Sequence, residues 1–169
     1  MKTLTYAVLT LALLSPTGTL AGREDATKQA FAKMKTLVGK WKGTMGEGAD
    51  AFPATVEYKL TGSGSALVET LGPGSQYEMV SIYHMDNGNL VMTHYCGAGN
   101  QPSMKLKPGK NPNVLFFDFT KGSNMKLTDT HMHNVTFTFD GPDHVVADWV
   151  SFSKGKPGDH AKFDLRRVK

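Results

Sequence analysis

The feature that most constrains the fold is a long series of short segments in which apolar and polar residues alternate. Residues 54–60 are typical: Ala54, Val56, Tyr58 and Leu60 alternate with polar side chains, the pattern of a strand with one buried face. Clusters of Gly, Pro, Asn and Asp separate these segments, and Asn87-Gly88 is a strong signal for a tight hairpin. Nine or ten strands at regular spacing are typical of an all-β barrel or sandwich, and the short turns favour an antiparallel up-and-down order. The predicted strands are one that opens at 39–41 and then 54–60, 66–71, 76–85, 90–96, 103–106, 114–120, 131–139, 145–152 and 161–168.

One amphipathic helix is expected before the strands. In residues 25–38 the apolar side chains recur at helical spacing on one face. Asp25 is suited to cap the start of this helix and Gly39 to end it. The helix must bury its apolar stripe against one end or edge of the β structure.

The first 21 residues are expected to be a secretory signal peptide. Lys2 supplies the positive charge, and residues 4–14 form an apolar run that is too short to span a bilayer. Small residues precede a predicted cleavage site after Ala21. We therefore expect an exported chain, periplasmic or secreted, with one β-barrel domain at 22–169 and no membrane association after cleavage.

Charge and cysteine content narrow the classes of partner. The formal net charge is +4, and the basic residues are scattered, without the clustered patch that nucleic-acid binding requires. Cys96 is the only cysteine, so no internal disulfide can form, and this side chain is either a buried small residue or a functional thiol. The sequence leaves the oligomeric state open.

The two ends of the predicted β domain resemble those of lipocalins and other calycins. Gly39-Lys40-Trp41 opens the first strand, and Arg166-Arg167 closes the last. The resemblance implies structural roles for Gly39, Trp41 and Arg167, in which the indole plugs one end of the barrel and the guanidinium stacks on it. Such cation–π contacts contribute about 0.5–2 kcal/mol.

A wider resemblance covers nearly the whole mature chain. Residues 93–96 leading into 99–102, then His131-Met132-His133 and residues 135–139, resemble a family of exported bacterial calycin-like proteins with no agreed activity. A remote relation to the haem-binding nitrobindin barrels is not supported by a terminal motif: His160 precedes Leu165-Arg166 without matching the pattern of those proteins. Haem is therefore not expected.

Four side chains suggest a metal site. Period-two alternation places His94 and Cys96 on one strand face, and His131 and His133 on the face that also carries Val135. If both faces point into the barrel, these residues could meet across the lumen and bind Zn or Cu. The alternative is that they are separate polar positions near the barrel mouth. No standard zinc motif supports the metal interpretation.

A second interpretation is a cavity for a small, apolar ligand, lined by soft and aromatic side chains. The same side chains could equally form a solid core. Glu69 and Glu78 could face inward from successive strands or lie at the surface, and we base no acid–base mechanism on them. The candidate lining residues are Met79, Tyr83, Met85, Met92, Phe116, Phe119, Phe137 and Trp149.

No nucleophile elbow or phosphate-binding loop occurs in the sequence, and we do not expect an enzyme. The leading hypothesis is an exported β-barrel that binds a small ligand in or at the mouth of the barrel, with His94, Cys96, His131, His133, Tyr83, Met92 and Trp149 as binding residues. The first alternative is a metal-binding protein or metal-dependent enzyme that uses the three His and Cys96. The second is a structural or interaction domain with a solid core.

Overall fold

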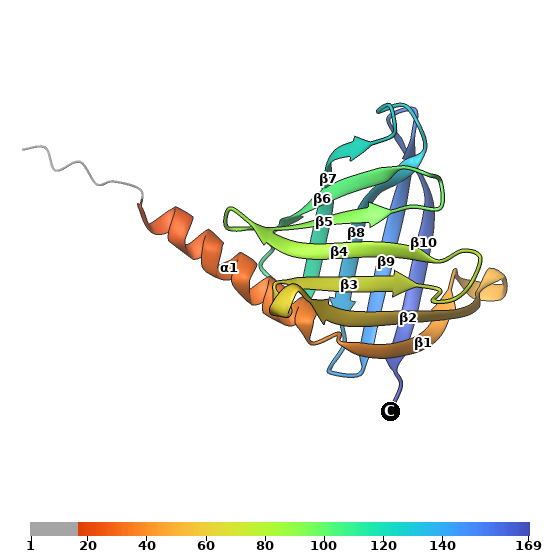
Figure 1. Cartoon of the computed structure of the whole chain (residues 1–169), viewed down its shortest axis with the longest axis horizontal. Helices are drawn as coiled ribbons and strands as arrows, with labels where there is room; N and C mark the ends of the chain where they lie inside the picture. The colour runs from red at the N-terminus through yellow and green to blue at the C-terminus, as the bar shows by residue number, and fades with distance from the viewer. Residues whose placement is uncertain (1–16) are drawn as a thin grey trace, which may run out of the picture.

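A computed structural model describes residues 17–169 as a closed antiparallel barrel preceded by one helix (Figure 1). Every strand pairs with its neighbours in sequence, and β1 and β10 close the barrel. The predicted all-β, up-and-down barrel is thus confirmed. The elements are α1 (Thr17–Lys35), β1 (Gly39–Met45), β2 (Phe52–Thr61), β3 (Ala66–Leu71), β4 (Met79–Asp86), β5 (Asn89–Tyr95), β6 (Gln101–Lys107), β7 (Val114–Ser123), β8 (His131–Phe139), β9 (His144–Ser153) and β10 (Lys156–Arg167), with short 3-10 turns at Gly48–Asp50 and Gly62–Gly64.

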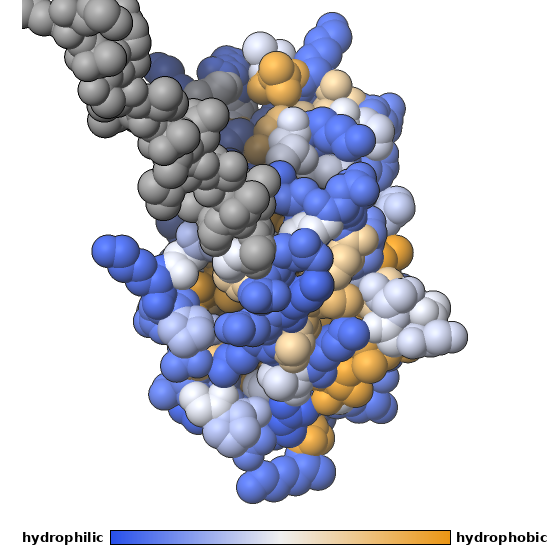
Figure 2. Space-filling view, turned by 90° about the vertical axis from the view of Figure 1, so that its left-hand side faces the viewer, coloured by the Kyte–Doolittle hydropathy of each residue, from blue (hydrophilic) through white to orange (hydrophobic). Residues whose placement is uncertain are grey.

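Alternation along the strands separates a packed interior from a mostly polar exterior. In β9, Val145, Ala147, Trp149 and Ser151 are buried and the residues between them are less so. Because successive side chains point to opposite faces, each strand contributes every second residue to the core. Seen from the side that carries α1, the outer surface is largely hydrophilic with scattered apolar patches (Figure 2).

The helix is longer at its start and shorter at its end than the sequence predicts. It begins at Thr17 instead of Asp25 and ends at Lys35, so a turn separates it from Gly39. Phe31 and Met34 are buried, and α1 packs against β4 and β5. The apolar run at 4–14 lies outside the described residues. No helix within 17–169 is long and apolar enough to cross a membrane.

Several strand boundaries also differ from the prediction, among them the starts of β4 and β10. The segment from Gln76 to Glu78 belongs to the β3–β4 turn, and β10 begins at Lys156 instead of Ala161. Only Lys154 and Gly155, both with positive φ, make the β9–β10 turn, and a register shift between Pro157 and His160 lets the strand continue through a Pro-Gly pair. Sequence rules read this pair as part of a turn.

Arg167 and Trp41 close one end of the barrel. The Trp41 indole is buried and donates to the carbonyl oxygen of Leu37 at 2.7 Å. The Arg167 guanidinium lies over the Trp41 ring, 4.4 Å from its centroid, and donates to the carbonyl oxygens of Thr36 and Val38. Gly39 has φ +128°, and a Cβ there would lie 3.3 Å from Arg167 Nη1. These contacts join the helix end to both strands of the closing pair.

Candidate functional site

A row of polar side chains runs across the inner face of four adjacent strands. Tyr58 on β2 pairs with Glu69 on β3, Glu69 with Ser81 on β4, and Ser81 with His94 on β5. All four side chains are buried. We call these four residues the polar row. Buried polar groups are costly unless they are hydrogen-bonded, so their arrangement demands an explanation.

Glu69 is the centre of the row. Its two carboxyl oxygens accept hydrogen bonds from the hydroxyls of Tyr58, at 2.7 Å, and Tyr83, at 2.8 Å. Burial raises the pKa of the Glu69 carboxyl, whereas the hydrogen bonds of Tyr58, Tyr83 and Ser81 act to lower it. Burial and then the neighbouring carboxylate raise the pKa values of both tyrosines well above their ordinary value, so both phenols remain donors.

His94 ends the row and is incompletely hydrogen-bonded. Its Nδ1 lies 3.0 Å from Ser81 Oγ, and its ring lies against the Trp149 indole, with centroids 4.8 Å apart. Burial lowers the pKa of His94 to about 4, so the imidazole is neutral at pH 7. Within residues 17–169, neither His94 Nε2 nor Trp149 Nε1 has a hydrogen-bond partner, although both atoms are buried.

These two unpaired atoms are the strongest indication of a binding site. Leaving a buried polar atom unsatisfied costs about 1–3 kcal/mol, and two such atoms lie on rings in contact. An indole N–H can only donate, whereas an imidazole nitrogen donates or accepts according to its tautomer. The pair is therefore suited to a small polar group that hydrogen-bonds to both rings from beside them.

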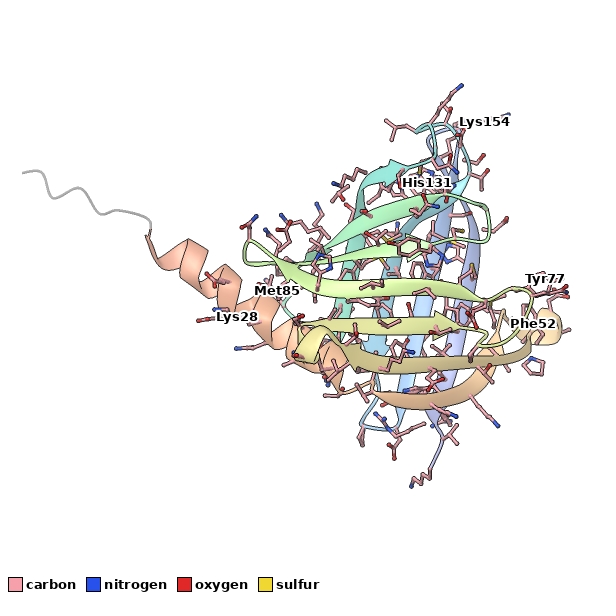
Figure 3. The ribbon with its side chains drawn as sticks, in the orientation of Figure 1. Lys28, Phe52, Tyr77, Met85, His131 and Lys154 are labelled. Carbon is pink, nitrogen blue, oxygen red and sulfur yellow. The ribbon has the colours of Figure 1, made fainter. Side chains whose placement is uncertain are left out.

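A cavity of about 330 Å³ opens at the end of the barrel opposite the Trp41–Arg167 stack. Phe52 and Tyr77, both exposed, lie together at this end (Figure 3). Leu71 and Met79 also line the cavity, two residues along β3 and β4 from Glu69 and Ser81. Residues i and i+2 of a strand lie on one face, about 6.6 Å apart, so the cavity lies one layer of side chains beyond the polar row.

His131 and His133 form a separate pair at the start of β8. Because the carbonyl oxygen of Asp129 can only accept, His131 Nδ1 donates to it, at 2.8 Å. His131 Nε2 then accepts from His133 Nδ1, at 3.0 Å, when both rings are neutral. His133 lies between the rings of Phe119 and Phe152, with centroids 5.0 and 3.7 Å away.

The position of His133 could not be read from alternation, since the β8–β9 register shifts between Met132 and Asn134. The pairing of β7 with β8 ends at Asp118 and Asn134. His131 and His133 therefore lie just beyond the last β8 residue that pairs with β7. The pKa of His133 lies below its ordinary value, because partial burial and then the neighbouring His131 disfavour the charged ring. Asp118 acts in the opposite direction without reversing this shift.

The structure does not bring the four predicted metal ligands into one group. His94 contacts Ser81 and Trp149, whereas His131 and His133 contact each other. Cys96 follows the end of β5, is half-buried, and belongs to a turn in which its backbone N–H donates to Asn100. Within residues 17–169 no three His, Cys, Asp or Glu side chains converge as metal ligands do.

The predicted lining residues fall into two sets. Tyr83, Met92 and Phe137 are fully buried core residues, and Tyr83 belongs to the Glu69 cluster. Phe116 lies between the buried Leu115 and Phe117 and so faces outward.

Glu78 is exposed and accepts from the backbone N–H of Gly74. The sequence leaves open whether Glu69 faces inward, and it gives no reason to single out Ser81. The one signal for both residues is the alternation of β3 and β4, which places them on the inner face of the barrel.

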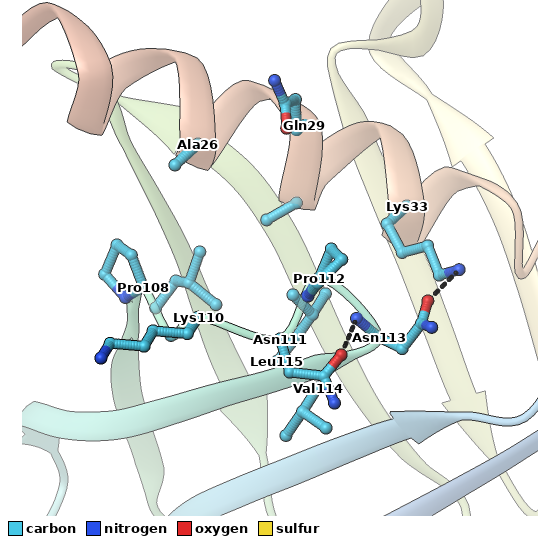
Figure 4. A pocket seen from close by; sticks show the side chains of 13 residues that line it. Ala26, Gln29, Lys33, Pro108, Lys110, Asn111, Pro112, Asn113, Val114 and Leu115 are labelled. Atoms are coloured by element: carbon cyan, nitrogen blue, oxygen red, sulfur yellow. Dashed lines mark hydrogen bonds between the residues drawn. The ribbon is translucent and has the colours of Figure 1, made fainter.

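A second cavity, of about 400 Å³, lies between α1 and the β6–β7 loop (Figure 4). Lys33 Nζ donates to Asn113 Oδ1 across it, at 3.0 Å. Pro108 and Pro112 line it, together with Ala30 of the helix. None of the described residues that line it has a buried unpaired side-chain atom, so this cavity lacks the feature that distinguishes the barrel interior.

Comparisons with known proteins support the fold alone. No family model and no curated protein matches the chain. The structure is similar to that of a protein of unknown function from the DUF3598 family of Nostoc punctiforme, with a TM-score of 0.56 and 15% identity over 80% of this chain and 48% of that one. This chain thus matches about half the length of that protein. It is also similar to Rv2717c from M. tuberculosis, with a TM-score of 0.55 and 16% identity over 83% of this chain and 98% of that one.

Proposed function

We propose that this chain is an exported binding protein that holds a small ligand inside the barrel, beside His94 and Trp149. The observation that carries the proposal is the pair of buried, unpaired nitrogens, His94 Nε2 and Trp149 Nε1. A ligand that hydrogen-bonds to both atoms would remove the cost of leaving them unsatisfied.

The apolar cavity at the open end supplies the route and the remaining contacts. Most ligand sites combine an apolar lining with a few placed polar groups. Met79 lines the cavity two residues along β4 from Ser81, and its flexible side chain can change rotamer as a ligand enters. The ligand's apolar part would occupy the cavity while its polar group reaches the two rings.

Export is the second part of the proposal. Cleavage after Ala21 would leave Gly22 at the N-terminus and preserve the helical residues that contact the barrel, among them Thr27, which donates to the carbonyl oxygen of Gly88. Sequencing the N-terminus of protein recovered from the medium or periplasm tests this: a mature chain that begins at Gly22 supports export, and an intact Met1 found only in the cytoplasm contradicts it.

Native mass spectrometry tests the binding function. Protein purified without denaturation is expected to carry an extra non-covalent mass that denaturation removes. The variant His94→Phe should lose this mass, whereas the control His84→Phe, on the exposed face of β4, should keep it. A folded wild type with identical native and denatured masses, even after incubation with extracts of its source, would favour a solid-core structural domain.

Elemental analysis of the same samples tests the metal-binding alternative. His133 Nε2 is the ring nitrogen of the pair that its hydrogen bond leaves available, so it is the best single candidate for a ligand. Stoichiometric Zn or Cu that is lost in His133→Ala or in His94→Ala would support a metal-handling protein and would show which of the two sites holds the metal. Metal-free protein with a bound organic mass would support the interior site.

A further inference from the structure

One hydroxyl proton in the polar row determines what His94 can offer a ligand. Ser81 lies between Glu69 and His94 in the strand register and is close to both side chains. A serine hydroxyl has a single proton, so it can donate to only one of them at a time. The neighbour that does not receive it must itself donate to Ser81 Oγ or lose that hydrogen bond.

An ionised Glu69 carboxylate, the form that its three hydroxyl donors stabilise against the effect of burial on its pKa, is the stronger acceptor. The groups that hydrogen-bond to Glu69 in the described chain are hydroxyls, from Tyr58, Tyr83 and Ser81. Hydrogen bonds to an ionised acceptor are about twice as strong as those between neutral groups, so the Ser81 proton points to Glu69. His94 Nδ1–H then donates to Ser81 Oγ, and the imidazole presents an unprotonated Nε2 beside the Trp149 N–H.

We infer that the interior site selects an uncharged ligand with a hydroxyl group, which donates to His94 Nε2 and accepts from Trp149 Nε1–H. This inference rests on the proposed function and names its ligand class. It also gives Glu69 and Ser81 a role as positioning residues, because they set the tautomer of His94 without touching the ligand.

Other ligand classes satisfy only part of this arrangement. A ketone or ether accepts from Trp149 but has no proton for His94 Nε2. A carboxylate also has no proton to donate to His94 Nε2. In addition, it places a second negative charge near Glu69 in a region of low dielectric. An ammonium donates to His94 but cannot accept from Trp149. A site built to hydrogen-bond a hydroxyl discriminates strongly against analogues that lack it.

The first test needs no ligand. Nitrogen-15 NMR of the histidine rings in the full mature chain distinguishes a protonated from an unprotonated nitrogen. We expect His94 to be protonated at Nδ1, although free neutral imidazoles favour Nε2–H. Ser81→Ala, which is small enough to leave the fold intact, should return His94 to the Nε2–H form, and Glu69→Gln, whose amide can donate to Ser81, should do the same. Nε2–H in the wild type would overturn the inference.

The second test uses phenol, toluene and benzoate as size-matched probes, followed through the indole N–H resonance of Trp149. The resonance is assigned with Trp149→Phe, since Trp41 is the other tryptophan. We expect phenol to bind about tenfold or more tightly than either analogue, the equivalent of one good hydrogen bond. Ser81→Ala should remove this preference, and His84→Phe should retain it.

The outcomes separate the inference from the function on which it rests. Equal binding of phenol and toluene, or a co-purified ligand without a hydroxyl, overturns the hydroxyl selection and leaves the interior site in place. If no probe shifts the Trp149 resonance and the protein carries no co-purified mass, both proposals fail.

Discussion

His94 and the His131–His133 pair are histidine sites of opposite kinds within one barrel. The rim pair is anchored to the carbonyl oxygen of Asp129, which determines the protonated nitrogen of each neutral ring. Among the residues that the structure describes, His94 is hydrogen-bonded only to Ser81, and its second nitrogen has no partner. His131 has partners for both ring nitrogens and so contributes to structure, whereas His94, left incomplete in the core, is available to bind something else.

The largest expected effect concerns Glu69. Glu69→Ala leaves the hydroxyls of Tyr58 and Tyr83 unpaired in the core, which should reduce the free energy of unfolding by about 2–5 kcal/mol in urea denaturation. Glu57→Ala on the outer face of β2 serves as the control and should cost under about 0.5 kcal/mol.

A triple variant sharpens this result. Glu69→Leu combined with Tyr58→Phe and Tyr83→Phe removes the carboxyl and both phenols at once, leaves Ser81 paired with His94, and should recover most of the loss. A Glu69→Ala protein as stable as the wild type would show that the tyrosines find other partners, and the centre of the polar row would have to be reassigned.

The second effect is pH dependence at His94. Its pKa of about 4 in the folded chain lies below the ordinary 6.5, so between these values the unfolded chain binds the extra proton and stability falls as pH falls. The loss from pH 7 to 4 amounts to about 3 kcal/mol.

Glu69 acts in the opposite direction, because its raised pKa favours the folded state at low pH. The quantity to measure is therefore the difference between wild type and His94→Phe, which keeps Glu69. The wild type should lose stability more steeply on acidification through this range. Parallel pH profiles would mean that His94 is accessible to water, contrary to its burial.

The third effect is smaller and lies at the rim. His133→Ala removes one hydrogen bond and the stacking on Phe119 and Phe152, which together should cost about 1–2 kcal/mol at pH 7. His133→Phe keeps the stacking and should cost about half as much. A loss above about 4 kcal/mol, seen by urea denaturation, would mean that the rim pair supports the barrel more than its exposure indicates.

The smallest effect is expected at His84. Its side chain is exposed on the outer face of β4, so His84→Phe should change the free energy of unfolding by less than about 0.5 kcal/mol. A larger change in the same urea titration would disqualify this variant as the control for His94.

The sequence predicts the barrel well because alternation and turn chemistry are local signals. Every predicted strand exists, and His94 faces inward as its period-two pattern requires. The prediction is weaker where geometry is not local. The register shift at His133 and the continuation of β10 through Pro157 depend on the partner strand, and only the register between β3, β4 and β5 joins Glu69 to His94.

The pairing of β1 with β10 has a consequence for how such a chain is made. All other pairs form between neighbouring segments, whereas this one joins the first strand to the last. While the chain emerges from a ribosome or a translocation pore, β1 has one edge unpaired until Lys156–Arg167 has followed. Unpaired edges are sites of aggregation, so the final twelve-residue strand ends a period of exposure that lasts through the synthesis of the eight strands between β1 and β10.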